Sequence, residues 1–479
     1  MTASAQAPAH DLPLVSPELV TELLELARAQ GGEFAEVYAE RGVHSGLALE
    51  ENRLRHAQYS VHQGVGVRVI AGEQTGYAYA DGFDPGDLRE AARVAARIAR
   101  GASAGARPPA FRVVDAPPPF VLHEPAPLTL ETEAKADMLQ RANAAARGHD
   151  ARVHEVSASM ADSSRRFLVA NSDGVWAEDT MFLARLTVSV VAADGQVRQH
   201  GLATGGGSVE ARYFTAERPP ESIALDAATS AVTLLAAREP DAGSWPVVVA
   251  PGWGGVMVHE CFGHSMEGDG IRKHSSIRAT QRGQLVAAPC VTIVDSGRVP
   301  FSRGSFRVDD EGTPAQRTVL VQDGILVGYM WDVLNARLAN ERPTGNGRRA
   351  SYREFPLCRM TNTWIEPGPH APGELIASVD RGLYCKHLAG GSVNPADGNF
   401  SFQVTEAWRI ERGRLTEPVR NATLTGNGND AMLKIDAVAN DLVIDGTTGS
   451  CGKDGQWKPV GVGQPTVRFT GITVGGTRT

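Results

Sequence analysis

The hydrophobic pattern of this chain changes near residue 240, and that change limits the folds that it can adopt. Before it, short alternating segments such as VGVRVI and TGYAYA lie between amphipathic segments that predict helices near 17–30, 85–100, 131–148 and 219–237. After it, β-branched runs such as CVTIVD alternate with glycine-rich turns. We therefore expect an α+β fold: an N-terminal α+β domain at 13–240, followed by a β-rich C-terminal domain at 241–479 that carries the helix described below.

Two segments stand apart from this division. Residues 1–12 are rich in alanine and proline, and we expect a mobile tail there. Residues 101–128 contain too many prolines to pair continuously in a sheet, so they predict a linker or a strap over the surface. After the tail, Ser16 and Pro17 form a helix-start signal, with Ser16 as the N-cap.

The composition argues against several classes of partner. A formal net charge of -8 leaves no basic field for nucleic acid. No stretch approaches about 18 continuous apolar residues, and the first residues lack the pattern of an export signal. The 5 cysteines are scattered and form no C-x-x-C pair, which argues against a disulfide framework and a zinc ribbon. We expect a cytoplasmic protein with no membrane and no direct nucleic-acid partner.

The segment VMVHECFGHSMEGDG carries two histidines around a glutamate. His259, Glu260 and His264 form H-E-x-x-x-H, one residue longer than the zinc-binding H-E-x-x-H pattern. The preceding WPVVVAPGWGG predicts a strand, a turn and the start of a helix. Five positions on an ideal α-helix leave the two rings about 140° apart. A π-bulge would realign them, or Gly263 could end the helix and let His264 come from the loop.

A catalytic zinc site needs a third protein ligand, an open position for water and a nearby carboxylate. Glu260 adjoins the first histidine and is the natural base. The pattern alone fits a buried polar helix end equally well. Candidate third ligands are Glu267, Asp269, His274 and Cys451. A lone cysteine is more often a small buried hydrophobe, and we expect Cys261, between the histidines, to pack in the core.

Several longer segments resemble the TldD/PmbA family, specifically its TldD branch. They are HECFGHSMEGD, DDEGTPAQRTVLVQDGILVGY, PTGNGRRASYREFPLCRMTNT, AGGSVNPADGNFSFQVTEAW, TLTGNG and TTGSCGKDGQWKPVGVGQPT. The resemblance covers nearly the whole C-terminal half and is looser before it. It implies a metallopeptidase in which His259, His264 and Cys451 hold one Zn²⁺ per chain and Glu260 is the general base. It also implies that Glu267 supports the site or contacts the substrate.

The same resemblance implies hydrolysis of unfolded or extended peptides, in a cleft where the substrate backbone could pair with a strand edge. It further implies a dimer, formed either with the family's metal-free TldE/PmbA paralogue or with a second copy of the chain. Two alternatives stay open. One is a binding or scaffold protein with a structural zinc site, for which Glu267 would be the fourth ligand. The other is a metal-dependent amidase acting on small molecules.

Four other charged residues carry weaker signals. In NFSFQVTEAWRI, Glu406 falls on the apolar face of a predicted strand, so its carboxylate needs a partner or solvent. We expect a salt bridge there, with a role in the substrate cleft as the alternative. Arg348, Arg349 and Arg353 are expected on a solvated charged loop, with binding of a peptide carboxylate as the alternative.

Overall fold

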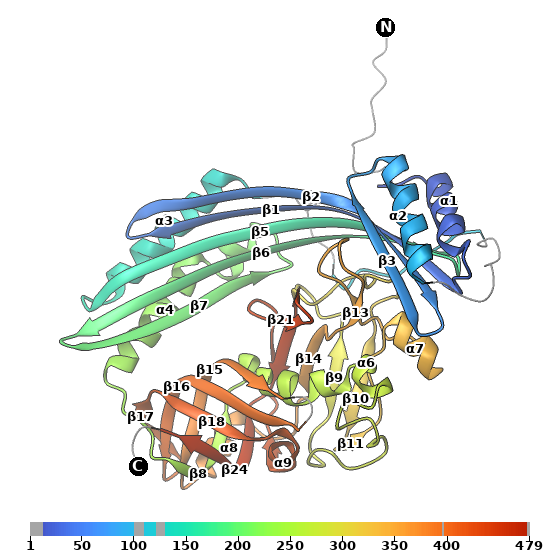
Figure 1. The fold of residues 1–479 in the computed structure, drawn as a ribbon. Helices are drawn as coiled ribbons and strands as arrows, with labels where there is room; N and C mark the ends of the chain where they lie inside the picture. The colour runs from blue at the N-terminus through green and yellow to red at the C-terminus, as the bar shows by residue number, and fades with distance from the viewer. Residues whose placement is uncertain (1–12, 100–109, 121–129, 395–396, 477–479) are drawn as a thin grey trace.

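The protein is a mixed α/β structure in which a long, arched sheet lies over a second half built from smaller sheets (Figure 1). The computed structural model describes residues 13–99, 110–120, 130–394 and 397–476. The expected α+β fold is confirmed. The predicted tail at 1–12 lies outside the described residues, and so does most of the predicted strap at 101–128.

The four helices expected in the N-terminal half all form. They are α1 (Pro17–Arg28), α2 (Pro85–Ile98), α3 (Thr132–His149) and α4 (Pro220–Leu235), the last preceded by a π-helical turn, η1 (Tyr213–Glu217). Ser16 caps α1 by accepting a hydrogen bond from the Leu19 N–H at 3.3 Å, with Pro17 as the first helical residue. Asp84 caps α2 through two backbone N–H groups. The start signal predicted at Ser16 and Pro17 is therefore confirmed, and Asp84 is a cap that the structure adds.

One sheet of seven strands forms the arch. Its strands are β1 (Phe34–Glu50), β2 (Arg53–Ala71), β3 (Gln74–Asp81), β4 (Arg112–Val113), β5 (Val153–Asn171), β6 (Val175–Asp194) and β7 (Val197–Gly207). The order is β3-β2-β1-β5-β6-β4, with β7 also paired to β6, and only the β4–β6 pair is parallel. β4 belongs to the described part of the predicted strap, which thus contributes a short edge strand.

The strands of the arch are much longer than the alternating segments in the sequence. VGVRVI covers only the buried part of β2, which spans 19 residues. Residues 53–61 of the same strand are exposed on both faces. Because no core lies against this part of the strand, its side chains carry no hydrophobic alternation from which it could be predicted.

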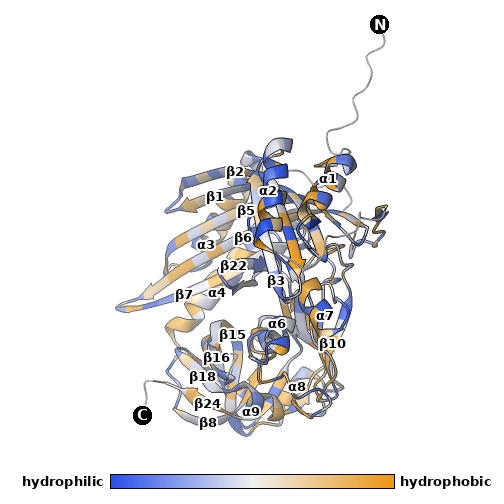
Figure 2. Ribbon diagram, turned by 45° about the vertical axis from the view of Figure 1, so that its right-hand side comes forward, coloured by the Kyte–Doolittle hydropathy of each residue, from blue (hydrophilic) through white to orange (hydrophobic). Residues whose placement is uncertain are grey.

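The two faces of the arch differ in what they contact. Val37 of β1 packs in a core with α1 and α2, and Leu47 packs in a core with α3 and α4. Side chains of a strand point alternately to its two faces, so Glu36 and Tyr38, on either side of Val37, point to the opposite face, toward the C-terminal half. Figure 2 shows the resulting alternation as hydrophobic and hydrophilic bands along the long strands. The helices thus cover one face, and the C-terminal half lies against part of the other.

The C-terminal half contains two larger sheets. One has the order β11 (Ile325–Leu326), β10 (Arg317–Gln322), β9 (Ile293–Ser296), β14 (Asn362–Ile365), β23 (Gly461–Gln464), β20 (Val443–Asp445). The other has the order β15 (Arg381–Val393), β8 (Gly243–Val249), β24 (Val467–Gly475), β18 (Ala422–Asn427), β16 (Asn399–Glu411), β17 (Arg414–Val419), with β19 (Ile435–Val438) on β24. Because β15 also pairs with β16, five strands of this second sheet close into a ring.

Smaller elements complete this half. The hairpins are β12 (Gly347–Arg348) with β13 (Leu357–Cys358), and β21 (Ser450–Lys453) with β22 (Gln456–Pro459). The short helices are α6 (Gly268–Arg272), α7 (Val333–Ala339), α8 (Pro372–Ala377) and α9 (Gly428–Leu433). α4 ends at Leu235 and β8 begins at Gly243, and within the described residues no named strand of one half pairs with a strand of the other. The described helices include none long and apolar enough to cross a membrane.

The salt bridge expected for Glu406 is present. Its carboxylate is buried in β16 and accepts hydrogen bonds from Lys386 Nζ and from the Ser230 hydroxyl, both at 2.7 Å. Lys386 and Ser230 lie on different elements, β15 and α4. Glu406 therefore joins the two halves of the chain.

The expectation of a solvated arginine loop is wrong for two of its three members. Arg348 is 2% exposed and Arg349 is fully buried, whereas Arg353 is exposed and pairs with Asp81. Arg349 donates to the Glu36 carboxylate and, at 2.9 Å, to the backbone carbonyl of Asp310. Both arginines are buried because the arch covers this loop, and the Glu36 carboxylate, more than 300 positions earlier in the chain, compensates the Arg349 charge.

Arg349 belongs to a larger buried ion network between the arch and the C-terminal half. We define this network as Glu36, Glu40, Arg68, Arg165, Asp310, Glu311, Arg349 and Lys458. Arg68 bonds Glu36 at 2.9 Å and Glu311 at 2.6 Å, so one guanidinium joins carboxylates from both halves. Arg165 of β5 pairs with Asp310, and Lys458 of β22 donates to the same carboxylate at 3.2 Å. Charges of opposite sign thus meet where the two halves are in contact.

We predict that Arg349→Ala destabilises the protein strongly, because it leaves the Glu36 carboxylate buried beside one fewer cation. The expected loss is about 3–5 kcal/mol in the free energy of unfolding, measured by urea denaturation with tryptophan fluorescence. Arg353→Ala is the matched control from the same loop, and its exposed salt bridge should contribute far less. Equal losses in the two variants would contradict a stabilising role for the network.

Candidate metal centre

The H-E-x-x-x-H segment begins where a buried strand meets a tight glycine turn. The apolar β8 ends at Val249, and Gly252, with φ at +79°, opens the 3₁₀ turn η2 (Gly252–Gly255). The helix α5 (Val256–Val258) follows directly. Gly255 lies against β23 so closely that a Cβ would be 2.4 Å from the carbonyl oxygen of Gly463. Only glycine fits there, and the segment that bears the histidines therefore lies directly on β23.

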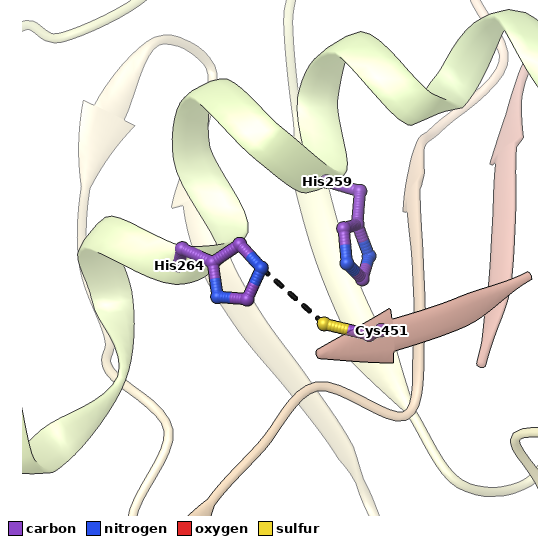
Figure 3. A group of neighbouring side chains, drawn as sticks. All are labelled: His259, His264 and Cys451. Carbon is purple, nitrogen blue, oxygen red and sulfur yellow. Dashed lines mark hydrogen bonds between the residues drawn. The ribbon is translucent and has the colours of Figure 1, made fainter. Parts of the chain in front are cut away.

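The two histidines are brought together by a π-helical turn, η3 (His259–Gly263). The His264 N–H donates to the His259 carbonyl, which is the i to i+5 hydrogen bond of a π-turn. The ring centroids are 5.3 Å apart, with ring planes at 85° (Figure 3). Of the two arrangements that the spacing allowed, the π-turn is the one that forms. The chain continues through η4 (His264–Met266) into α6.

Cys451 meets these histidines from the β21–β22 hairpin. Its Sγ lies 3.3 Å from His264 Nε2, and one ligand atom from each of the three side chains lies within 4.8 Å of the others (Figure 3). In a tetrahedral zinc site, nitrogen and sulfur ligands stand about 3.5 Å from each other. Among the candidate third ligands, Cys451 is therefore the one placed with both histidines. Cys261 instead lies in the hydrophobic core, as expected.

The electrostatics of the three side chains suit a cation. Burial alone would raise the pKa of the Cys451 thiol, but hydrogen bonding and positive charge from His259 and His264 lower this pKa to about 4. The thiolate is therefore the stable form near neutral pH. His259 Nδ1 is buried and has no hydrogen-bond partner among the described residues. Two imidazoles and a thiolate are a donor set that zinc binds well, so the residues present fit this metal.

Glu267 contacts the other edge of the His264 ring. Its Oε2 is 3.3 Å from His264 Nδ1, whereas Cys451 lies near Nε2. Burial alone would raise the pKa of Glu267, but the charges of Lys453 and His264 lower it to about 2. An ionised carboxylate at this position accepts a hydrogen bond from Nδ1–H, which leaves Nε2 free to bind a metal. In this position Glu267 orients a candidate ligand, and it does not share the Nε2 side as a fourth ligand would.

Lys453 is a functional candidate that the sequence reasoning missed. Its Nζ donates to Glu267 Oε2 at 2.9 Å, to Asp269 Oδ1 at 2.7 Å and to the Cys358 carbonyl at 3.1 Å. A usable signal was present in the sequence, because Lys453 follows Cys451 by two positions and successive odd positions of a strand share a face. One strand thus supplies both the thiol and the cation that holds Glu267.

Glu260 opens onto a cavity of about 610 Å³. His264 and Cys451 line the same cavity, and residues 390–393 at the end of β15 form part of its wall. The pKa of Glu260 is raised, mainly by burial and also by the negative charges of Cys451 and Glu267, while the histidines oppose the shift. A carboxylate with a raised pKa is better suited to accept and release a proton near neutral pH. The centre is therefore accessible to a ligand and has a proton acceptor beside it.

Sequence comparison finds matches to three family domains that together cover most of the chain. Residues 35–99 match "PmbA/TldA metallopeptidase domain 1", 125–235 match the central domain and 242–476 match the C-terminal domain. The chain is similar to "Metalloprotease TldD homolog" of Haemophilus influenzae, with 38% identity over 97% of both chains. It is also 31% identical to "Zinc metalloprotease TldD homolog" of Saccharolobus solfataricus, over 51% of this chain and 54% of that one.

The fold has a counterpart among solved structures. TldE from Thermococcus kodakarensis superposes with a TM-score of 0.78 at 19% identity, covering 96% of this chain and all of the other. At that level of identity the likeness concerns the fold alone.

We predict that Glu267→Gln weakens zinc binding about 10- to 100-fold, since the amide orients and polarises His264 less well than a carboxylate. The affinity can be measured by competition with a chromophoric chelator. Asp269→Asn is the matched control, because Asp269 shares Lys453 with Glu267 and has no hydrogen bond to His264. If the two variants bound zinc equally well, Glu267 would not orient the ligand.

Proposed function

Since this chain belongs to the PmbA/TldD family of metallopeptidases, we propose that it is a zinc-dependent peptidase that hydrolyses unfolded or extended peptides. The observation that carries the proposal is the meeting of His259, His264 and Cys451 beside Glu260 at one open cavity. An open ligand position is what separates a catalytic zinc site from a structural one. The position of Glu267, behind His264, supports the catalytic assignment.

Each residue has a distinct part in the proposed reaction. His259, His264 and Cys451 would hold one zinc ion per chain, which supplies Lewis acidity and makes water a nucleophile near neutral pH. Glu260 takes a proton from the attacking water and delivers it to the leaving amine. Glu267 keeps His264 in the tautomer with the proton on Nδ1. Lys453 balances the charge of Glu267, so that this carboxylate stays ionised while buried.

The wall of the cavity suggests how a peptide would bind. β15 pairs with β8 only at Leu383–Cys385, and beyond Cys385 no described strand pairs with this edge. The free edge includes residues 390–393, which line the cavity next to the metal centre. An extended peptide can add to such an edge through backbone hydrogen bonds, and these bonds do not depend on which side chains the peptide carries. We assign this edge to the substrate backbone.

We propose that the protein works as a dimer, with a metal-free paralogue or with a second copy. In β2, the outer edge of residues 53–63 has no strand partner among the described residues, because β3 pairs only from Gly64 onward. This segment exposes Leu54, Tyr59 and Val61, at 46%, 65% and 48%. A long unpaired edge with exposed apolar side chains is the kind of surface that a second chain covers.

We predict that Glu260→Gln abolishes peptide cleavage while leaving zinc bound. Loss of a general base lowers the rate about 10²- to 10⁴-fold, and the three candidate ligands remain in place. The measurement is mass spectrometry of an unstructured peptide mixture incubated with the purified zinc-loaded protein. Zinc content is determined on the same samples.

The outcomes separate the proposal from its alternatives. Fragments from the parent that vanish in Glu260→Gln support a peptidase with Glu260 as its base. Cleavage of small acyl amides with no action on longer peptides would favour an amidase instead. If neither protein cleaves peptides despite bound zinc, the metal-free paralogue must be added, and continued inactivity would leave a binding protein as the better description.

We predict that N-methylation of a substrate peptide weakens its binding with a two-residue period. Each lost backbone hydrogen bond at the β15 edge should reduce the affinity about 3- to 10-fold, because alternate N–H groups of an extended peptide point to that edge. The affinities are measured by fluorescence anisotropy with Glu260→Gln, which does not consume the peptide. Methylation at the intervening positions is the control, and a pattern without alternation would argue against strand addition.

A further inference from the structure

A second cavity, of about 440 Å³, lies on the face of the arch that looks toward the C-terminal half. Its wall includes Ser60 of β2, Ser163 of β5 and Arg185 of β6, with Arg303 contributed by the C-terminal half. Ser163 and Ser60 both lie opposite His44 of β1 in the strand register, so these side chains share a face with His44. No residue of the metal centre lines this cavity, so it is a separate space under the arch.

Arg185 has no partner of opposite charge here. Its strand neighbours are Ala161 of β5, with a methyl side chain, and Gly206 of β7, with none, so neither offers a polar group to the guanidinium. Among the described residues, Arg185 makes no hydrogen bond or salt bridge, although it is only partly exposed. Asp162 lines the cavity too, but its carboxylate pairs with Lys135 of α3 on the helix-covered face. The five donors of the Arg185 guanidinium are therefore available to a ligand.

Arg303 adds a second positive charge. Its Nη1 donates to the carbonyl oxygens of Thr447 and Gly449, at 3.1 and 3.2 Å, and it has no carboxylate hydrogen-bonded to it within the described structure. Burial and the neighbouring charge of Arg185 lower the pKa of Arg303 to about 10, while Asp445 opposes the shift. The Asp445 carboxylate itself accepts hydrogen bonds from Thr447 and Thr448. Two mutually repelling cations thus stand at one end of the cavity.

The same segment of chain links this cavity to the metal centre. Gly449, which Arg303 holds, precedes the candidate ligand Cys451 by two residues. With about 3.8 Å between successive Cα atoms, the Arg303 guanidinium lies within about 13 Å of the Cys451 Cα. An extended peptide advances about 3.3 Å per residue, so about four residues span that distance. An extended substrate at the candidate metal centre is therefore long enough to span the distance to Arg303.

We propose that this cavity is a carboxylate-binding subsite, which receives either an acidic side chain or the C-terminal carboxylate of a peptide held at the metal centre. The proposal rests on the proposed peptidase function and adds a preference for a negative charge about four residues from the cleaved bond. The guanidinium of Arg185 has no partner among the described residues, so two of its N–H groups can bind one carboxylate. The Ser60 and Ser163 hydroxyls are further donors. The subsite would position the substrate and takes no part in the chemistry.

The test compares peptides that differ only in one Glu or Gln, placed in turn two to six residues on each side of a mapped cleavage site. Binding to zinc-loaded Glu260→Gln is measured by fluorescence anisotropy, and cleavage by the parent is measured as kcat/KM. We expect Glu to be preferred about five- to tenfold at one position and the preference to fall to about one with Arg185→Gln. In Arg185→Glu the preference should reverse, so that a peptide with Lys at this position is bound better than the peptide with Glu.

The controls separate this proposal from others. Arg198→Gln removes an exposed arginine of β7 that pairs with Glu155, and it should keep the Glu preference. Peptides with a C-terminal amide distinguish a terminal carboxylate from an acidic side chain as the ligand. Cleavage without any Glu preference, or a preference unchanged in Arg185→Gln, overturns the subsite alone. If no cleavage site can be mapped, Glu is instead placed at each position of the peptide in turn, and a Glu preference in binding that Arg185→Gln removes would then support the subsite and count against the peptidase function.

Discussion

The candidate metal centre depends on a buried ion network that holds the arch to the C-terminal half. Lys458 of β22 donates to the Asp310 carboxylate and, at 2.6 Å, to the Arg349 carbonyl, so the network reaches the hairpin that carries Cys451. Arg359 donates to the Cys451 carbonyl at 2.6 Å on the same hairpin. Buried charges are costly unless each is compensated, and such a network therefore tolerates little displacement. The Cys451 thiol is held from its backbone side by Arg359 and by the network around Lys458, none of which belongs to the candidate ligand set.

A second constraint acts on the histidines. The π-turn places His264 beside His259, and the glycine contact between Gly255 and Gly463 holds the whole segment on β23. Glu267 then orients the His264 ring, and Lys453 holds Glu267 from the strand that bears Cys451. The helical segment and the hairpin therefore position each other. Each contributes candidate ligands, and each supplies a charged group that fixes the other.

The sequence predicts the parts of this structure that depend on local signals. Ser16 begins a helix because its side chain caps a free N–H group, and the spacing of His259 and His264 allows a π-turn by geometry. The parts that it does not predict depend on residues far apart in the chain. The sequence places Arg349 on a solvated loop, because its partner, Glu36, is more than 300 positions away and no local pattern links the two residues. The exposed half of β2 has no core against it and hence no hydrophobic period.

The distance in sequence between His264 and Cys451 has a consequence for the time at which activity can arise. During synthesis, residue 451 leaves the ribosome only when almost the whole chain has been made, long after the segment that carries His259 and His264. A partly made chain carries both histidines and Glu260 but no thiol to complete the site. The order of the elements along the chain therefore delays completion of the candidate centre until the nascent protein is nearly finished.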